Sequence, residues 1–203
     1  NFDVTGFIAH GPRMSIKPAQ GMPSQEASVW ATDDALALSF TSRYADDWRY
    51  CAAWGKWMLW TGSRWQADDT LLAHHLIRAI CREAALKADS HRLAAKLAAS
   101  NTVGGVERLA RTDRRHASTS DEWDADTFAL NTPGGVVDLK TGRIKPHDRR
   151  DRMTKLATAT PRGDCPKWRA FLSDVTGGDA DLQFYLQRMV GYCLTGVTSA
   201  HAL

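Results

Sequence analysis

The first regular pattern in the chain is a set of apolar residues that recur at every fourth position. Leu36, Phe40 and Tyr44 follow this spacing, and Thr32 stands before them as a candidate N-cap. Two aspartates directly after Thr32 suit the positive end of a helix dipole. The pattern therefore predicts a short amphipathic helix that ends near Ala45.

Alanine-rich segments in the middle of the chain repeat this helical spacing. The apolar positions predict helices over residues 70–87, 92–100 and 103–114. For the third of these helices, Asn101 or Thr102 is the expected N-cap, because both side chains accept hydrogen bonds from a first helical turn.

Two further helices are predicted late in the sequence. Trp168 and Phe171 lie at helical spacing and predict a helix over residues 165–175. Asp179 is the expected N-cap of the next helix, and Gly196 is the expected residue C′ after its end. The side chains expected to point inward from this last helix are Leu182, Leu186, Met189, Val190 and Cys193.

Aromatic residues crowd the segment WRYCAAWGKWMLWTGSRWQADD. A turn at Thr61 and Gly62 predicts a β-hairpin with strands near residues 57–60 and 64–66. The tryptophans of this segment are Trp48, Trp54, Trp57, Trp60 and Trp65. Two interpretations stay open: the cluster is a platform on which nucleic-acid bases stack, or it is the aromatic core of a small sheet.

A second β region is predicted in the segment FALNTPGGVVDLKTGRIKPH. Three short apolar runs are separated by two glycine-containing turns, which is typical of an antiparallel meander. A last extended run covers residues 154–160. The expected fold class is α+β, mainly helical with a small Trp-rich β-hairpin and a short β-meander.

The two ends of the pattern suggest the domain organisation. Residues 1–30 are rich in Gly, Pro, Ser and Gln and have no periodicity, so we expect a flexible arm or linker. Residues 31–203 are expected to form the folded domain, with residues 117–127 as a polar connection inside it.

Composition places the chain among ordinary globular proteins. Its 203 residues are 43% hydrophobic and 24% charged, and no run approaches the roughly 18 apolar residues of a membrane span. The first residues have no basic-then-apolar signal layout, so the expected location is the cytoplasm. Cys51, Cys81, Cys165 and Cys193 are far apart and are expected to be buried free thiols, with a disulfide or metal site as the alternative.

Charge is distributed unevenly along the chain, although the net charge is only +3. Residues 92–116 carry six Lys or Arg against two acidic residues, and residues 140–155 carry seven against two. Two concentrated basic segments indicate an electrostatic footprint for phosphates or for an acidic partner. The alternative is two solvated basic faces that bind nothing.

The sequence contains no recognisable catalytic motif. The glycines of NTPGGVVDLKTG do not have the GxxxxGK[ST] spacing of a phosphate loop, and no helix is predicted after them. Asp124 and Asp126 form a DxD pair, which is a candidate for metal-dependent nucleotidyl transfer or, alternatively, for helix capping or a solvated turn. His74 and His75 are adjacent, so they point to different helix faces and are not expected to share a metal ion.

The passage LNTPGGVVDLKTGRIKPHDRRDRMTKLATATP resembles the phage and plasmid primase–helicase family of the poxvirus and satellite-phage type. The similarity lies in the domain immediately before the superfamily-3 helicase domain and extends over roughly residues 33–203. One departure is Gly134, where the family often has Asn. The matching residues are Leu130, Asn131, Gly135, Val137, Asp138, Leu139, Thr141, Gly142, Pro146, His147, Thr154, Lys155, Pro166, Phe171, Leu172, Gln187, Gly191, Tyr192, Leu194, Thr195 and Gly196.

The resemblance implies a non-catalytic domain that supports DNA binding and is coupled to a hexameric motor in DNA replication. ATP and Mg²⁺ are then expected in a helicase domain after Leu203, toward which the helices of residues 165–196 lead. The expected partners are DNA without sequence preference, that helicase domain and neighbouring subunits, in a bacterial cell that carries a phage or prophage. The candidate DNA-binding residues are Lys140, Arg143, Lys145, Arg149, Arg150, Lys155, Arg108, Arg111, Arg114 and Arg115.

Two other functions remain open on the sequence. The basic segments could serve a subunit or partner interaction module that does not touch DNA. The chain could also be a primase-type nucleotidyl transferase that uses Asp124 and Asp126.

Overall fold

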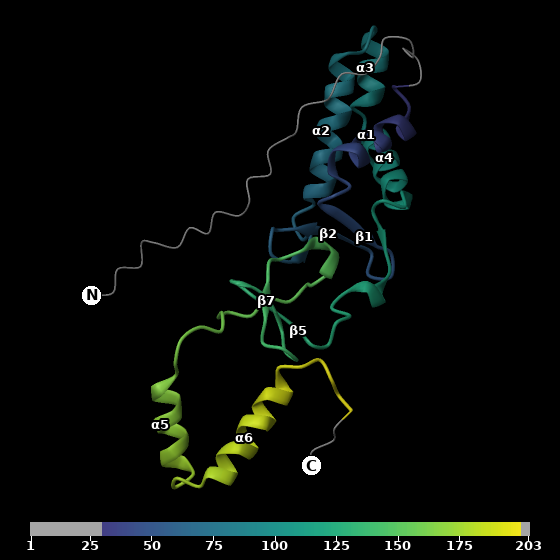
Figure 1. The fold of residues 1–203 in the computed structure, drawn as a ribbon. Coiled ribbons are helices and arrows are strands. Elements are labelled where there is room, and N and C mark those ends of the chain that lie inside the picture. Colours follow the sequence, from purple (N-terminus) through teal and green to yellow (C-terminus); the bar gives the residue numbers. More distant parts are fainter. Residues whose placement is uncertain (1–29, 200–203) are drawn as a thin grey trace, which may run out of the picture. The chain divides into compact units, whose positions relative to one another are not determined.

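The computed structural model describes residues 30–199, and the chain forms two compact units (Figure 1). Unit 1 contains the chain up to Thr61 together with Ala67–Thr119. Unit 2 contains Gly62–Gln66 and the chain from Ser120 onward. The α+β class predicted from the sequence is confirmed. The predicted arm of residues 1–30 lies almost wholly outside the described residues.

Unit 1 is built on the helices that the apolar spacing predicted. Phe40, Ile77 and Val106 come from three different helices and have no exposed surface, so they form the centre of one core. Thr32 caps the first helix, as predicted, by accepting a hydrogen bond from the backbone N–H of Ala35 at 3.2 Å. The helices are α1 (Asp33–Tyr44), α2 (Leu72–Leu86), α3 (His91–Leu97) and α4 (Ser100–Thr112).

The N-cap predicted for α4 is wrong. The helix begins at Ser100, its N-cap position is Ala99, and no side chain caps it. Thr102 already belongs to the first turn and is only 6% exposed. Its hydroxyl donates to the carbonyl of Lys96 at 2.8 Å, and this carbonyl also accepts from the N–H of Ala99 at 3.1 Å.

The first sheet has four strands in the order β3-β2-β1-β4. The strands are β1 (Trp48–Cys51), β2 (Lys56–Trp60), β3 (Trp65–Ala67) and β4 (Ala117–Ser118). The hairpin of β2 and β3 was predicted, whereas β1 and β4 were not. In unit 1, β1 is antiparallel to β2 and parallel to β4. Trp48 is fully buried and Trp57 is 6% exposed, so these two tryptophans are core residues and do not form a stacking surface.

Unit 2 contains the predicted meander of β5 (Ala129–Thr132), β6 (Gly135–Asp138) and β7 (Ile144–Lys145). All neighbouring strands are antiparallel. Gly135 begins β6 with a φ of +131°, and a Cβ there would stand 2.5 Å from the carbonyl oxygen of Lys145. Only glycine fits this turn, because both the backbone conformation and the space exclude a side chain.

A segment without regular secondary structure, residues 153–157, is hydrogen-bonded to β3 and to β5. The N–H of Trp65 donates to the carbonyl of Met153 at 2.8 Å, and the N–H of Ala157 donates to that of Asn131 at 2.8 Å. The side-chain amide of Asn131 also donates to the carbonyls of Ser63 and Lys155, both at 2.9 Å. Asn131 therefore joins three pieces of chain. Residues 154–160, for which an extended run was predicted, form no strand.

In unit 2 the side chain of Arg152 contacts two buried tryptophans. The guanidinium of Arg152 lies 5.6 Å from the ring centre of Trp65 and 5.2 Å from that of Trp123. The indole N–H of Trp65 donates to the carbonyl of Arg149 at 2.8 Å. Both tryptophans are at least 94% buried, so Trp65 is likewise a core residue. Burial lowers the pKa of Arg152, which is opposed by the charge of Glu122.

The last two helices are α5 (Pro166–Val175), which begins one residue after the predicted start, and α6 (Ala180–Cys193), which Asp179 caps as expected. The prediction that α6 packs inward is wrong, because no residue of either helix is buried. The prediction of Gly196 as C′ is also wrong. The C-cap of α6 is Leu194, and the N–H of Gly196 instead donates to the carbonyl of Thr127 at 2.8 Å.

All four cysteines are free thiols. Cys51 and Cys81 are buried, as predicted, and burial raises the pKa of Cys81 to about 11. The prediction of burial is wrong for Cys165 and Cys193, which are exposed. They stand at an end of α5 and of α6, and neither helix contains a buried residue. Among the described helices, none is long and apolar enough to cross a membrane.

Candidate nucleic-acid interface

Two candidate cations lie at the turn between β6 and β7. The carboxylate of Asp138 accepts from the N–H of Lys140 at 2.8 Å and from the hydroxyl of Thr141 at 2.7 Å, and these hydrogen bonds lower its pKa. Gly142 adopts a φ of +70°, which lets the chain reverse and return as β7. The turn thus holds Lys140 and Arg143 at one end of the meander, and both residues are exposed.

The environments of these two cations differ. The ammonium of Lys140 lies 4.3 Å from the ring centre of Phe128, which is a cation–π contact that leaves its hydrogen-bond donors available. Within the described part of the chain, Arg143 forms no ion pair. Both side chains therefore retain the capacity to bind phosphate oxygens.

Further cations follow in β7 and in the short 3-10 helix Arg149–Asp151. The ammonium of Lys145 lies 2.8 Å from a carboxylate oxygen of Asp151. The guanidinium of Arg150 holds both carboxylate oxygens of Asp148, and these hydrogen bonds lower the pKa of Asp148 to about 2. The carbonyl of Arg149 accepts from the indole of Trp65, and Arg149 forms a further interaction within the chain.

These ion pairs are exposed to solvent. The Lys145 and Arg150 side chains are 58% and 87% exposed. Pairs of this kind contribute little to stability, so their cations remain free to exchange a carboxylate for a phosphate. Lys155 is also exposed, and its backbone is held by Asn131. The structure thus brings the six predicted cations of residues 140–155 into unit 2.

The four predicted cations of the other basic segment belong to unit 1, on α4 or just after it. Arg111 donates to Glu107 at 2.5 Å and lies 5.1 Å from the ring centre of Tyr50. Glu107 also accepts from the indole N–H of Trp57 at 3.2 Å. Burial by itself would raise the pKa of Glu107, but these hydrogen bonds lower it. Arg111 therefore joins α4 to the sheet.

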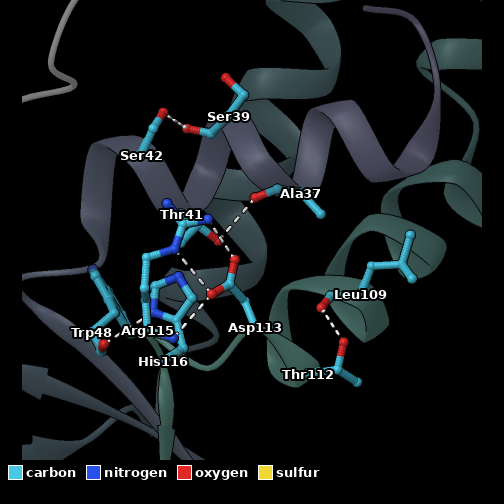
Figure 2. A network of polar contacts seen from close by, with 10 residues as sticks. All are labelled: Ala37, Ser39, Thr41, Ser42, Trp48, Leu109, Thr112, Asp113, Arg115 and His116. Atoms are coloured by element: carbon cyan, nitrogen blue, oxygen red, sulfur yellow. Dashed lines mark hydrogen bonds and ion pairs between the residues drawn. The ribbon is translucent and has the colours of Figure 1, made fainter. Parts of the chain in front are cut away.

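Arg115 is also held inside its own unit. Its guanidinium donates to both carboxylate oxygens of Asp113, at 3.0 and 2.7 Å, and lowers the pKa of Asp113 to about 2. Figure 2 shows this pair beside His116 and Thr41. One ring nitrogen of His116, Nδ1, lies 3.0 Å from the carbonyl of Trp48. Burial lowers the pKa of His116, so this fully buried ring favours its neutral form.

Arg108 and Arg114 are the remaining candidates on this segment. Both are exposed, and neither forms an ion pair with a described residue. Residue spacing alone does not distinguish these two arginines from Arg111 and Arg115. A carboxylate four residues before Arg111 and another two residues before Arg115 are the sequence signals that separate them.

The residues considered for metal chemistry have structural partners. Asp124 accepts hydrogen bonds from the N–H and the hydroxyl of Thr154, the first at 2.6 Å. Asp126 accepts from the N–H of Phe128 at 3.0 Å. Across the described residues, no group of three or more His, Cys, Asp or Glu side chains is placed to hold a metal ion.

The two adjacent histidines lie in different surroundings, as the helical spacing predicted. His74 is half-buried, with Nδ1 3.4 Å from Glu107, whereas His75 is exposed. The sequence did not identify Arg152 and Asn131 as organising residues. No local pattern marks them, because their partners stand up to 87 positions away.

Comparison with known proteins assigns the chain to a family. A search of curated proteins finds no match to the chain. The family model described as D5 N terminal like matches residues 37–177, which is more than half of the sequence. This range includes both basic segments, the tryptophan-rich sheet and the meander. The chain belongs to the D5 N-terminal-like family, the domain found in the D5-type primase–helicase proteins of phages and poxviruses.

Proposed function

We propose that this domain is non-catalytic and contributes sequence-independent DNA contacts to a replicative primase–helicase. The observation that carries the proposal is the set of exposed cations in unit 2, at the β6–β7 turn and along residues 145–155. Cations of this kind neutralise phosphates irrespective of base identity. Among the four candidate cations of unit 1, Arg108 and Arg114 are exposed and form no ion pair with a described residue, so their charge is available for the same purpose.

The proposal assigns ATP and Mg²⁺ to a helicase motor rather than to this domain. The motor would move along DNA, while the domain holds the strand and transmits the motion to neighbouring parts of the assembly. We place this activity in the cytoplasm of a bacterial cell that carries a phage, prophage or plasmid, because proteins of the family act in DNA replication.

Fluorescence anisotropy with labelled single-stranded and double-stranded DNA tests the proposal. Contacts to about five phosphates predict that log K falls with log salt at a slope of roughly −4 to −5. The affinity should be similar for unrelated base sequences of one length. Absence of binding at low salt, or binding that salt does not weaken, would contradict the proposal.

A second function, attachment to a neighbouring protein subunit, is favoured by the surfaces of α5 and α6. Trp168, Phe171 and Tyr185 are about half exposed, although large apolar side chains usually lie in a core. The substitutions Phe171→Glu and Tyr185→Glu should impair assembly of the full-length protein and leave DNA binding by this chain unchanged. Analytical ultracentrifugation, together with the anisotropy assay, separates the two functions. A loss of DNA binding without an effect on assembly would contradict this second role.

A further inference from the structure

The outward side of α2 carries a stripe of residues that the DNA-binding proposal does not use. Leu71, His75, Arg78, Arg82 and Leu86 are all exposed. At 100° per residue they lie within an arc of about 80°, so they form one line along the helix surface. The α2 stripe, as we call these five residues, has two arginines near its centre and a leucine at each end.

The leucine at the start of the α2 stripe is displayed by a strained turn. Leu71 is 71% exposed and adopts a φ of +60°, a left-handed conformation that costs a leucine about 1 kcal/mol or more. The carboxylate of Asp68 enforces this turn, because it accepts hydrogen bonds from Thr70, Leu72 and Ala73. A glycine or asparagine would adopt the same conformation more easily and would not expose an apolar side chain.

The other end and the centre of the stripe are also open to a partner. Leu86 is 89% exposed. Arg78 and Arg82 stand one helical turn apart, and no carboxylate of the described residues forms an ion pair with either. A hollow of about 340 Å³ is lined by His75, Arg78, Ala79, Arg82, Glu83 and Leu86. The stripe therefore has apolar ends and a cationic centre, and all of its residues except Leu71 line a shallow depression.

We propose that the α2 stripe is a docking site for an acidic amphipathic helix of another protein. Two carboxylates one turn apart on that helix would pair with Arg78 and Arg82, and its apolar side chains would cover Leu71 and Leu86. The two leucines stand about 22 Å apart along the axis, so the partner helix spans about four turns. This inference goes beyond the DNA-binding function, since it concerns residues that the DNA-binding proposal does not use.

The composition of the stripe favours a protein helix over a nucleic acid. DNA offers phosphates to Arg78 and Arg82 but no apolar surface that would cover the leucines. Glu83 also lines the hollow, but it accepts a hydrogen bond from Arg43 at 2.9 Å, so this ion pair offsets its negative charge toward an acidic partner. A partner helix that carries both apolar and acidic side chains would cover the leucines and also pair with the arginines.

A synthetic peptide of about 18 residues, with two central glutamates four positions apart and leucines near both ends, provides the probe. Anisotropy of the labelled peptide with the whole chain should show saturable binding. The pair Arg78→Glu and Arg82→Glu should weaken it about tenfold or more, and a peptide with lysine in place of glutamate should restore binding to that variant. Arg92→Glu on α3 is the matched control and should leave the affinity unchanged, because that exposed arginine is outside the stripe.

A second variant tests the apolar end. Leu71→Asn suits the left-handed conformation, so the fold should be retained while peptide affinity falls several-fold. The proposal is overturned if the peptide does not bind at about 1 mM, or if the charge exchange does not restore binding. It is also overturned if the arginine substitutions weaken DNA binding and leave peptide binding intact, since the stripe would then be a nucleic-acid surface.

Discussion

Unit 1 and unit 2 both pair arginine with a carboxylate, but the pairs differ in burial. The side chains of Arg111 and Glu107 are 37% and 15% exposed, and Glu107 also accepts a hydrogen bond from the indole of Trp57. In unit 2, Arg150 holds Asp148 with better geometry, yet its side chain is 87% exposed. The same chemistry therefore fixes a fold where the pair is largely shielded from water, and leaves charge available to a ligand where water has access.

The largest expected effect comes from breaking the buried pair. Glu107→Ala leaves Arg111 and the indole N–H of Trp57 without their acceptor, and should lower the free energy of unfolding by about 2–3 kcal/mol. Urea unfolding followed by circular dichroism at 222 nm measures this change. Arg108→Ala, one position along the same helix, is the matched control and should shift the free energy by less than about 0.5 kcal/mol. Equal losses for the two variants would show that burial does not separate them.

Unit 2 also contains a largely shielded arginine, Arg152, and an exposed one, Arg150. Arg152→Ala removes the cation between Trp65 and Trp123 and should destabilise the unit by about 2 kcal/mol. Hydrogen exchange at the amide of Trp65, which donates to the carbonyl of Met153, reports on this unit directly. Arg150→Ala removes an exposed arginine of the same segment and should leave that exchange rate nearly unchanged. Faster exchange in the Arg150 variant than in the Arg152 variant would reverse the assignment.

A smaller effect is expected from pH. Burial lowers the pKa of His116 in the folded state below its unfolded value of about 6.5. The unfolded state therefore binds the proton more readily, and stability that is complete above about pH 6.5 is lost as the pH falls below it. The loss is at most about 1.4 kcal/mol per pH unit. Urea unfolding between pH 8 and pH 5 should show this slope in the parent chain and a reduced slope in His116→Phe. An unchanged slope would exclude His116 as its origin.

The sequence predicted the elements of this fold better than their packing. Leu36, Phe40 and Tyr44 predicted α1 and its buried face, because local spacing and core position coincide there. Apolar spacing also predicted the helix α6, but it did not predict that no residue of α6 is buried. Amphipathic spacing shows which face of a helix is suited to burial; it does not show which other surface covers that face.

The candidate interface was predictable to a similar degree. The cations at positions 140–155 were identified from charge density, and the structure brings them into one unit. The sequence did not show which cations of this segment would be shielded and which would be exposed. Arg152 is a core residue because Trp65 and Trp123 surround it, and those partners are distant in the sequence. Long-range contacts of this kind leave no mark in local composition.

The salt dependence of DNA binding by matched variants tests the central claim most directly. Replacing Lys140, Arg143 and Lys155 with glutamine should weaken binding about tenfold and reduce the steepness of log K against log salt by about 2 to 3. A control variant with glutamine at the exposed residues Arg92, Lys167 and Arg188 should keep the parental slope, because the account places no phosphate there. A parental slope in the first variant would contradict the assignment of these cations to DNA.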